Sequence, residues 1–270
     1  MNKIHILWAE MKKSHRHHFN NRLVYFSLFL WPAILFIQAY FSFSPFNLGE
    51  DSPLTRFVAA DQLGLYLIIG YLAYIFFWSM VQSAWQMAYE RQQGTLELIL
   101  LTPVNRTLFM FGRAAANLIE AVWLFSIFAI FTVVYIGELQ IASIWFIPFA
   151  VALLMLSAII WGGFLNVIFM FSRDAGILYT IFEAPMEFFS GVRMPIMAFP
   201  IWAKAIAFIF PLTYVLQIIR GFIMEGKTVS DMAQPLLLLA GILITLSLLT
   251  YWLVNKAERH VKKTGSLTLF

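Results

Sequence analysis

The octapeptide GFIMEGKT, residues 221–228, fits the pattern G-x-x-x-x-G-K-[ST], in which backbone N–H groups and a lysine hold nucleotide phosphates. That chemistry needs a strand, a glycine turn and a helix in succession. Here the match follows the stretch PLTYVLQIIR, which predicts a helix, and only 42 residues come after it. We therefore expect Lys227 to be a solvated turn residue, and we expect this chain to bind no nucleotide or other cofactor.

The other reactive residue types also give no catalytic pattern. The sequence contains no cysteine, which excludes disulfides, thiolate metal sites and cysteine nucleophiles. His15, His17 and His18 are close together, but their surroundings are basic and no acidic ligand is adjacent. The patterns H-E-x-x-H and G-x-S-x-G do not occur. We expect no metal site and no catalytic residues, so the chain is not predicted to be an enzyme.

The composition is that of a membrane protein. Of the 270 residues, 61% are hydrophobic and only 12% are charged. The apolar residues form long blocks, such as Pro235–Val254, in which 20 residues carry no charge. At about 1.5 Å per residue this block crosses the roughly 30 Å of a bilayer core.

These blocks predict an all-α integral membrane protein with a single six-helix transmembrane domain over residues 23–255. The expected spans are 23–42, 62–89, 105–136, 143–171, 175–191 and 235–255. The remaining residues, 256–270, form a basic tail.

Two further segments are apolar without being ordinary spans. Residues 1–22 carry apolar side chains at helical spacing, which predicts an amphipathic helix at the membrane interface, either a simple anchor or an elbow that also contacts a cytoplasmic partner. Residues 192–224 are interrupted by Pro195, Pro200 and Pro211. They predict re-entrant or interfacial short helices between the fifth and sixth spans.

The distribution of charge orients the chain in the membrane. In this topology 13 of the 18 basic residues lie on one side: at both termini, around the loop between the second and third spans, and at Arg173 after the fourth span. The opposite side carries Glu50, Asp51, Asp61 and Glu138. The positive-inside rule makes the basic side cytoplasmic, with both termini inside. We expect a multi-pass protein of the cell (inner or plasma) membrane, of bacterial origin.

The loop between the second and third spans contains an unusual apolar run, TLELILL, at residues 95–101. Gly94 is suited to end the preceding helix, and Thr102 with Pro103 is suited to begin another. The pattern predicts a short apolar helix over residues 94–103, held in the cytoplasm. Such a helix docks into a partner, or it folds back on its own bundle or on the membrane surface.

The same loop resembles the hallmark of the ABC-2 type permeases, the membrane subunits of one class of ATP-binding-cassette exporters. The matching residues are Glu90, Arg91, Gly94, Thr95, Leu96, Glu97, Leu101, Thr102, Pro103, Val104 and Arg106. A second similarity lies in residues 190–221, at Gly191, Pro195, Pro200, Pro211, Leu212, Thr213, Tyr214, Arg220 and Gly221.

The resemblance implies partners and a mechanism. Members of this family pair two membrane halves, identical or related, with two cytoplasmic ATPases that bind ATP and magnesium. The helix after Gly94 would then be the coupling helix, seated in the ATPase. The first motif favours the branch that exports drugs, peptides or lipids. We expect contact with membrane lipid and no nucleic-acid partner.

Polar side chains within the spans are candidates for a substrate path. Ser79, Gln82, Ser83 and Gln86 share one face of the second span, where they line a path or form hydrogen bonds between helices. On the fifth span we add Tyr179, Phe182 and Glu183, since the resemblance implies that these two spans line the path. Glu183 and Glu187 either attract a cationic substrate or serve the structure, with Glu187 paired to Arg193.

Two more expectations remain. Arg113, Asn117 and Glu120 are spaced for an ion-pair ladder within the third span.

The main prediction is an exporter of an amphipathic or lipidic substrate. The alternatives are a permease for a lipid-linked glycan, an ATP-independent six-span carrier or channel, and a membrane scaffold or enzyme that transports nothing.

Overall fold

The computed structural model describes residues 57–59, 62–94, 105–136, 145–172 and 174–264, together with a few single positions before them. Within these ranges the chain is helical, with short turns and no strand, which confirms the all-α class. The expected amphipathic helix at 1–22, almost all of the first expected span and most of the short helix at 94–103 lie outside the described residues.

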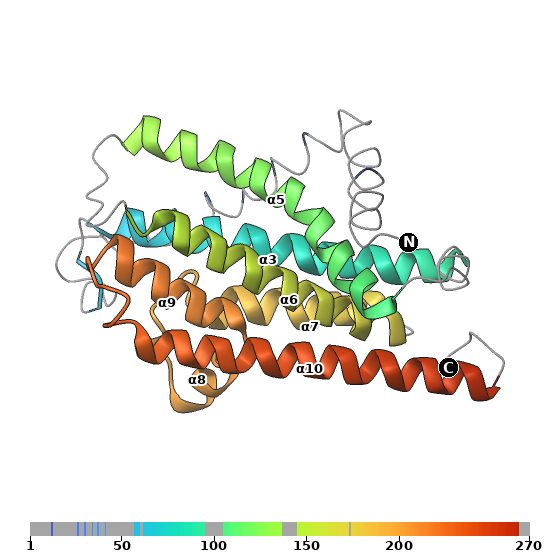
Figure 1. Cartoon of the computed structure of the whole chain (residues 1–270). Helices are drawn as coiled ribbons and strands as arrows, with labels where there is room; N and C mark the ends of the chain where they lie inside the picture. Colours follow the sequence, from blue (N-terminus) through green and yellow to red (C-terminus); the bar gives the residue numbers. More distant parts are fainter. Residues whose placement is uncertain are drawn as a thin grey trace.

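Among the described residues, four long helices form the bundle (Figure 1). They are α3 (Leu63–Gln92), α5 (Arg106–Ile136), α6 (Ile147–Phe171) and α10 (Ala233–Thr264). Each contains a stretch long and apolar enough to cross a membrane. The second, third, fourth and sixth expected spans therefore each correspond to such a helix. α10 continues beyond the expected span, through the first part of the expected basic tail.

Helix α3 occupies the centre of the bundle, and α10 lies at its edge. Within their most apolar windows, 83% of α3 is buried inside the chain but only 28% of α10. α3 packs against α5, α6, α7 and α9. The outer face of α10 presents large apolar side chains, among them Leu237 and Leu248. Such a face suits contact with lipid or with another membrane helix.

Four shorter elements connect α6 to α10. They are α7 (Ala175–Phe189), the 3₁₀ turn η3 (Ile196–Ala198), α8 (Ile201–Ala207) and α9 (Pro211–Ile223). α7 has 15 residues, fewer than the roughly 20 of a perpendicular span. α8 and α9 meet at 92°, as a broken span or a re-entrant loop would. The described residues thus contain four candidate spans, or five if this bent pair counts as one, and the number six stays a prediction.

Prolines and polar caps set these boundaries. Pro211 occupies the first turn of α9, where its missing N–H costs nothing, and Pro200 precedes α8. Asp174 caps α7, because its Oδ1 accepts a hydrogen bond from Ile177 N at 3.1 Å. These features explain why the apolar stretch 192–224 forms short helices rather than one span.

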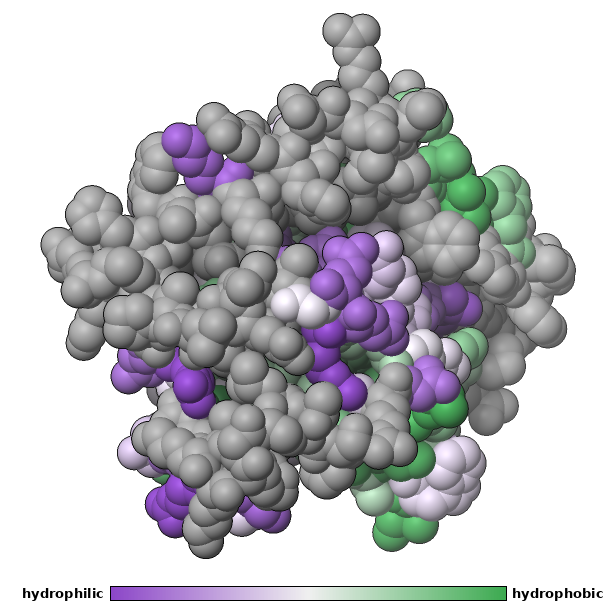
Figure 2. All heavy atoms as spheres, turned by 90° about the vertical axis from the view of Figure 1, so that its right-hand side faces the viewer, coloured by the Kyte–Doolittle hydropathy of each residue, from purple (hydrophilic) through white to green (hydrophobic). Residues whose placement is uncertain are grey.

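The two ends of the bundle can be named by their glycines. At the Gly94 end, α3 and α6 finish while α5 and α7 begin; at the Gly191 end, α7 finishes close to the start of α3. Figure 2 looks onto the Gly94 end, where the coloured residues near the centre are mostly hydrophilic. By the charge distribution, this is the end predicted to face the cytoplasm.

Candidate functional site

The Gly94 end is held together by the first two residues of the expected ATPase-coupling motif. Arg113 Nη1 in α5 donates to Glu90 Oε2 in α3 at 2.7 Å. Arg91 Nη1 donates to the carbonyls of Met170 and Ser172 at 2.7 and 2.8 Å. These carbonyls belong to the last turn of α6, where they lack helical partners and where a positive charge is favourable. Glu90 and Arg91 therefore fasten α3 to α5 and to α6.

Gly94 ends α3 as the sequence predicted. Its φ of +74° is a left-handed conformation that suits glycine, and its N–H is donated to Arg91 O at 3.0 Å. On the other side of the loop, Asn105 Oδ1 accepts from Leu108 N at 3.0 Å and caps α5, which Arg106 begins. The sequence pattern favoured Thr102 as a cap, whereas the side chain that caps α5 is that of Asn105. The motif residues Thr95, Leu96, Glu97, Leu101, Thr102 and Pro103 lie outside the described residues.

The prediction of an ion-pair ladder along α5, from Arg113 through Asn117 to Glu120, is wrong for Arg113. Its carboxylate partner is Glu90 on the neighbouring helix, 23 positions earlier in the sequence. Both side chains are largely buried, at 6% exposure for Arg113 and 18% for Glu90. A charge in such surroundings needs a partner at close range, which the helix crossing provides. The side chain of Glu120 is not among those described.

The predicted polar face of α3 is divided between the core and a contact with α7. Ser79 and Ser83 are buried, at 1% and 0% exposure, so neither presents a surface to a ligand in this conformation. Gln82 is half-buried and its Nε2 donates to Tyr179 Oη at 2.9 Å. Trp78 Nε1 donates to the same hydroxyl at 3.2 Å. The structure thus brings Gln82 and Tyr179 together, while Gln86 is half-buried near the Gly94 end.

The two carboxylates of α7 have different surroundings. Glu187 is buried and accepts hydrogen bonds from Arg193 Nε at 3.0 Å and from Tyr71 Oη at 3.3 Å. Glu187 therefore pairs with Arg193, which is the structural one of the two roles predicted for it. Glu183, one turn earlier, is only half-buried and interacts with Tyr179 and Trp78. Phe182 packs edge-on against Trp161, with ring centroids 5.8 Å apart.

A buried arginine near the Gly191 end was missed as a functional residue. Arg220 in α9 is 8% exposed and donates to three carbonyls: Nη1 to Gly191 O at 2.7 Å, and Nη2 to Tyr66 O at 2.9 Å and to Val192 O at 3.1 Å. Its guanidinium carbon also lies 3.4 Å from the centroid of the Tyr66 ring. Arg220 thus joins α9, the start of α3 and the segment after α7. The signals in the sequence were its charge within an apolar stretch and its place in the second family similarity, at residues 190–221.

The octapeptide at 221–228 does not have the geometry of a phosphate-binding loop. Gly221 lies in the last turn of α9, and Lys227 N donates back to Gly221 O at 2.9 Å. The hydroxyl of Thr228, which a phosphate-binding loop would present to magnesium, donates to Asp231 Oδ2 at 2.7 Å. The hydrogen bonds from Thr228 lower the pKa of the Asp231 carboxyl. Residues 221–228 therefore form the end of α9 and the first part of the turn that leads to α10.

The comparison with known families decides what the molecule is. The family model described as ABC-2 type transporter matches residues 5–224, most of the chain. The chain belongs to the ABC-2 type transporter family. It is thus a permease subunit of an ABC transporter and a multi-pass membrane protein, as the resemblance predicted. No curated protein matches the chain.

In this ABC-2 permease, an open cavity of about 580 Å³ lies between the Gly94 ends of α3 and α7. Its walls are Trp85, Tyr89 and Gln92 on α3 and Asp174, Ala175 and Gly176 at the start of α7. The rings of Trp85 and Tyr89 are stacked, with centroids 6.2 Å apart. The cavity therefore combines an aromatic wall with polar groups, and it opens next to the helix contact that Gln82 and Tyr179 make.

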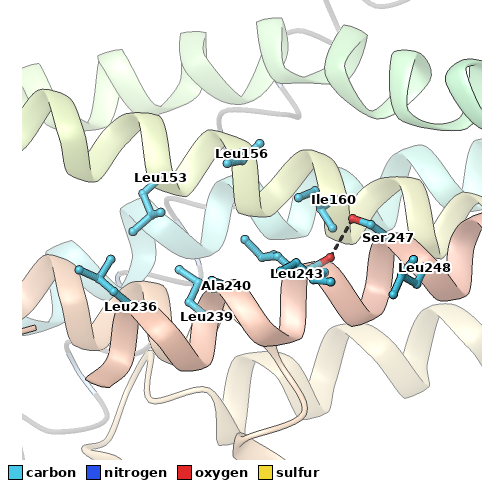
Figure 3. Close-up of a pocket in the computed structure, with 10 residues that line it drawn as sticks. Leu153, Leu156, Ile160, Leu236, Leu239, Ala240, Leu243, Ser247 and Leu248 are labelled. Carbon is cyan, nitrogen blue, oxygen red and sulfur yellow. Dashed lines mark hydrogen bonds between the residues drawn. The ribbon is translucent and has the colours of Figure 1, made fainter. Parts of the chain in front are cut away.

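A second cavity in the permease, of about 470 Å³, is a groove between α6 and α10 (Figure 3). Leu153, Leu156 and Ile160 form one side, and leucines of α10 form the other. Its only polar side chain is that of Ser247, whose hydroxyl donates to Leu243 O of the same helix at 2.8 Å. The groove offers a ligand no hydrogen-bonding group, so it suits hydrocarbon and carries no chemical selectivity.

Proposed function

We propose that this permease exports an amphipathic or lipidic compound from the cytoplasm or the inner leaflet. ATP hydrolysis on a separate ABC ATPase, present in two copies with bound ATP and magnesium, drives the transport. A second permease half, identical or related, completes the channel. The Gly94 end faces the cytoplasm of a bacterial cell, and both termini lie on that side. Family membership carries this proposal, since ABC-2 permeases work with such an ATPase.

The coupling segment of the proposal is residues 94–103. The residues that flank it, Glu90 and Arg91 before and Arg113 after, tie α3 to α5 and to the end of α6. A helix held between these points transmits a push from the ATPase to three membrane helices at once. The motif therefore has two parts: Leu96, Glu97 and Leu101 meet the ATPase, while Glu90 and Arg91 anchor the segment to the bundle.

The substrate path of the proposal follows the contact between α3 and α7. The cavity beside Trp85 and Tyr89 is its entrance from the cytoplasm or the inner leaflet. Beyond it lie Gln86, Gln82 and Tyr179, and then Glu183 and Phe182. Ser79 and Ser83 are buried beside this contact and join the path only when α3 and α7 separate. An aromatic and polar lining of this kind suits a compound with an apolar body and a polar group.

The test is co-purification of the permease with its ATPase from the native membrane. We expect an ATPase subunit of the ABC class to be retained by the wild type and lost on Glu97→Arg. The matched control is Glu225→Arg, which makes the same charge change on an exposed side chain outside the motif. Retention of the ATPase and of its turnover by Glu97→Arg would contradict the assignment of 94–103. Transport by the purified chain without any ATPase would instead indicate a carrier.

A further inference from the structure

The proposed path contains one acidic group without a basic partner among the described residues. Glu187 is neutralised by Arg193. Glu183 lies one turn away, half-buried, and its neighbours are the neutral side chains of Tyr179 and Trp78 together with the Glu187 carboxylate. A carboxylate at this depth of a membrane bundle is costly unless a positive charge or a proton accompanies it. The described part of the chain supplies neither an arginine nor a lysine to it.

A second observation at the same place is an unsatisfied hydroxyl. Tyr74 on α3 is 2% exposed, and among the described residues its Oη has no hydrogen-bond partner. The hydroxyl lies within electrostatic range of Glu187, Glu183 and Tyr179, which are all on α7. A buried hydroxyl without a partner is unfavourable, and native proteins rarely leave one without a reason. We call Tyr74, Trp78, Tyr179 and Glu183 the Glu183 cluster.

The types of side chain in the cluster select one ligand chemistry. Three aromatic rings and one unneutralised carboxylate are the groups that recognise organic ammonium and phosphonium ions, through the ring faces and through charge. An anionic compound would be repelled by Glu183 and Glu187. A neutral compound that displaced water would leave the Glu183 carboxylate either desolvated and unpaired or protonated, and it would gain no attraction from the acidic group. A cation with an apolar body satisfies both the carboxylate and the rings.

We propose that the Glu183 cluster is the recognition site for an amphipathic organic cation, which makes such cations the substrate class of this exporter. The inference rests on the proposed function, because it takes the α3–α7 contact to be the path. The cation enters at the aromatic cavity beside Trp85 and Tyr89 and moves along α3 to Glu183. The Glu187–Arg193 pair, being already neutral, marks the end of the attractive region.

The test compares two probes of similar size and shape, one charged and one neutral. Methyltriphenylphosphonium and triphenylphosphine oxide are offered to inside-out membrane vesicles that contain the permease with its co-purified ATPase, and ATP-dependent uptake is measured. We expect the wild type to accumulate the phosphonium in preference to the neutral oxide. Glu183→Gln keeps the shape of the side chain and removes its charge, and it should lower phosphonium uptake by about tenfold or more, the loss expected for a charge-assisted contact.

Two further variants separate recognition from folding. Glu183→Asp retains the charge and should restore most of the preference for the phosphonium. Glu187→Gln together with Arg193→Gln removes a neutral pair nearby without changing the net charge, so it should change the uptake of both probes in proportion. The affinity of the purified complex for the phosphonium, measured by equilibrium dialysis, should fall in the same order: wild type, then Glu183→Asp, then Glu183→Gln.

The outcomes are distinct for the two proposals. Three outcomes would overturn the cation site alone. The first is equal phosphonium uptake by the wild type and Glu183→Gln, and the second is an equal loss of both probes in Glu183→Gln. The third is no phosphonium uptake by a complex that retains its ATPase. If no ABC ATPase accompanies the chain, the proposed function itself fails. A folded Glu183→Gln variant that loses only the charged probe supports the cation site.

Discussion

Glu90 and Arg113 form an ion pair that closes the loop between α3 and α5. Arg113 Nη1 lies 2.7 Å from Glu90 Oε2, and the two residues stand in the sequence on either side of residues 91–112. The pair therefore fixes the distance between the two helices at the point where the proposed coupling segment joins the bundle. A segment fixed at both ends moves its helices when pushed, whereas a free loop would only bend.

Arg113→Ala should destabilise the protein markedly, because it removes the arginine from a Glu90 carboxylate that stays largely buried. Removal of one partner from a buried pair costs about 3–5 kcal/mol, and the partial exposure of Glu90 puts the expected loss at the lower end, about 3 kcal/mol. The measurement is thermal unfolding of the purified protein in detergent. Gln93→Ala, an exposed neighbour, should change stability by less than about 0.5 kcal/mol.

The double variant Glu90→Gln/Arg113→Gln sharpens this test. With both charges gone, the two amides can still form a hydrogen bond, and most of the stability should return. An Arg113→Ala protein that unfolds at the wild-type temperature would show that the pair contributes nothing to stability.

Gly70→Ala should be strongly destabilising, although alanine normally favours a helix. A Cβ at this position of α3 would lie 2.4 Å from Val192 O and 2.8 Å from Arg220 Nη2. Because the Val192 carbonyl is backbone and Arg220 is held by three hydrogen bonds, neither can move away easily. We expect a loss of several kcal/mol, at or above the roughly 1–3 kcal/mol typical of overpacking.

Gly64→Ala is the matched control in the same helix. A Cβ at Gly64 would meet nothing within 4 Å, so the variant should be neutral or stabilised by up to about 1 kcal/mol. Both proteins can be compared by thermal unfolding and by their elution on gel filtration. If Gly70→Ala were as stable as Gly64→Ala, the close contact of Arg220 with α3 would not exist in the folded protein.

Gly163→Ala should separate α6 from α5. Its Cβ would lie 2.2 Å from Cδ1 of the Phe111 ring, a distance that requires the whole ring to shift. Gly241 on α10 has open space around it, so Gly241→Ala is the control and should be tolerated. We expect Gly163→Ala to lower the unfolding temperature by several degrees, since an overpacked site typically costs about 1–3 kcal/mol. Equal unfolding temperatures for the two variants would contradict the tight packing of α6 on α5.

The sequence predicted helices where long apolar runs occur, because length and hydropathy alone decide whether a segment can cross a membrane. It also predicted the end of α3 at Gly94 and the broken segment 192–224, because glycine and proline act on the local backbone. The expected span 175–191 begins where α7 begins and extends two residues past its end at Phe189, into the turn that contains Ser190 and Gly191.

Contacts between helices were not predictable in the same way. The expected partner of Arg113 was one or two turns away on its own helix, since spacing along a sequence reveals only local neighbours. Its partner Glu90 depends on how α3 and α5 cross. The partners of Arg220 are backbone carbonyls, which every residue carries and which no sequence pattern marks. Tyr74, whose environment supports the cation site, was one tyrosine among many in the apolar runs.

Arg91 is expected to fasten α3 to the end of α6 rather than to contact the ATPase directly. Its guanidinium is occupied by the carbonyls of Met170 and Ser172, so we expect Arg91→Ala to retain the co-purifying ATPase. The freed carbonyls should cost about 1–3 kcal/mol of stability, and substrate-stimulated ATP turnover should fall because α6 no longer follows α3.

Arg91→Lys tests the same contact with a conservative change. A lysine carries the positive charge to the end of α6 and can reach a carbonyl there, so it should recover most of the stability and of the stimulated turnover. Gln92→Ala, an exposed neighbour on α3, should behave as the wild type in both measurements. Loss of the ATPase from Arg91→Ala at an unchanged unfolding temperature would place the Arg91 side chain in the interface with the ATPase instead.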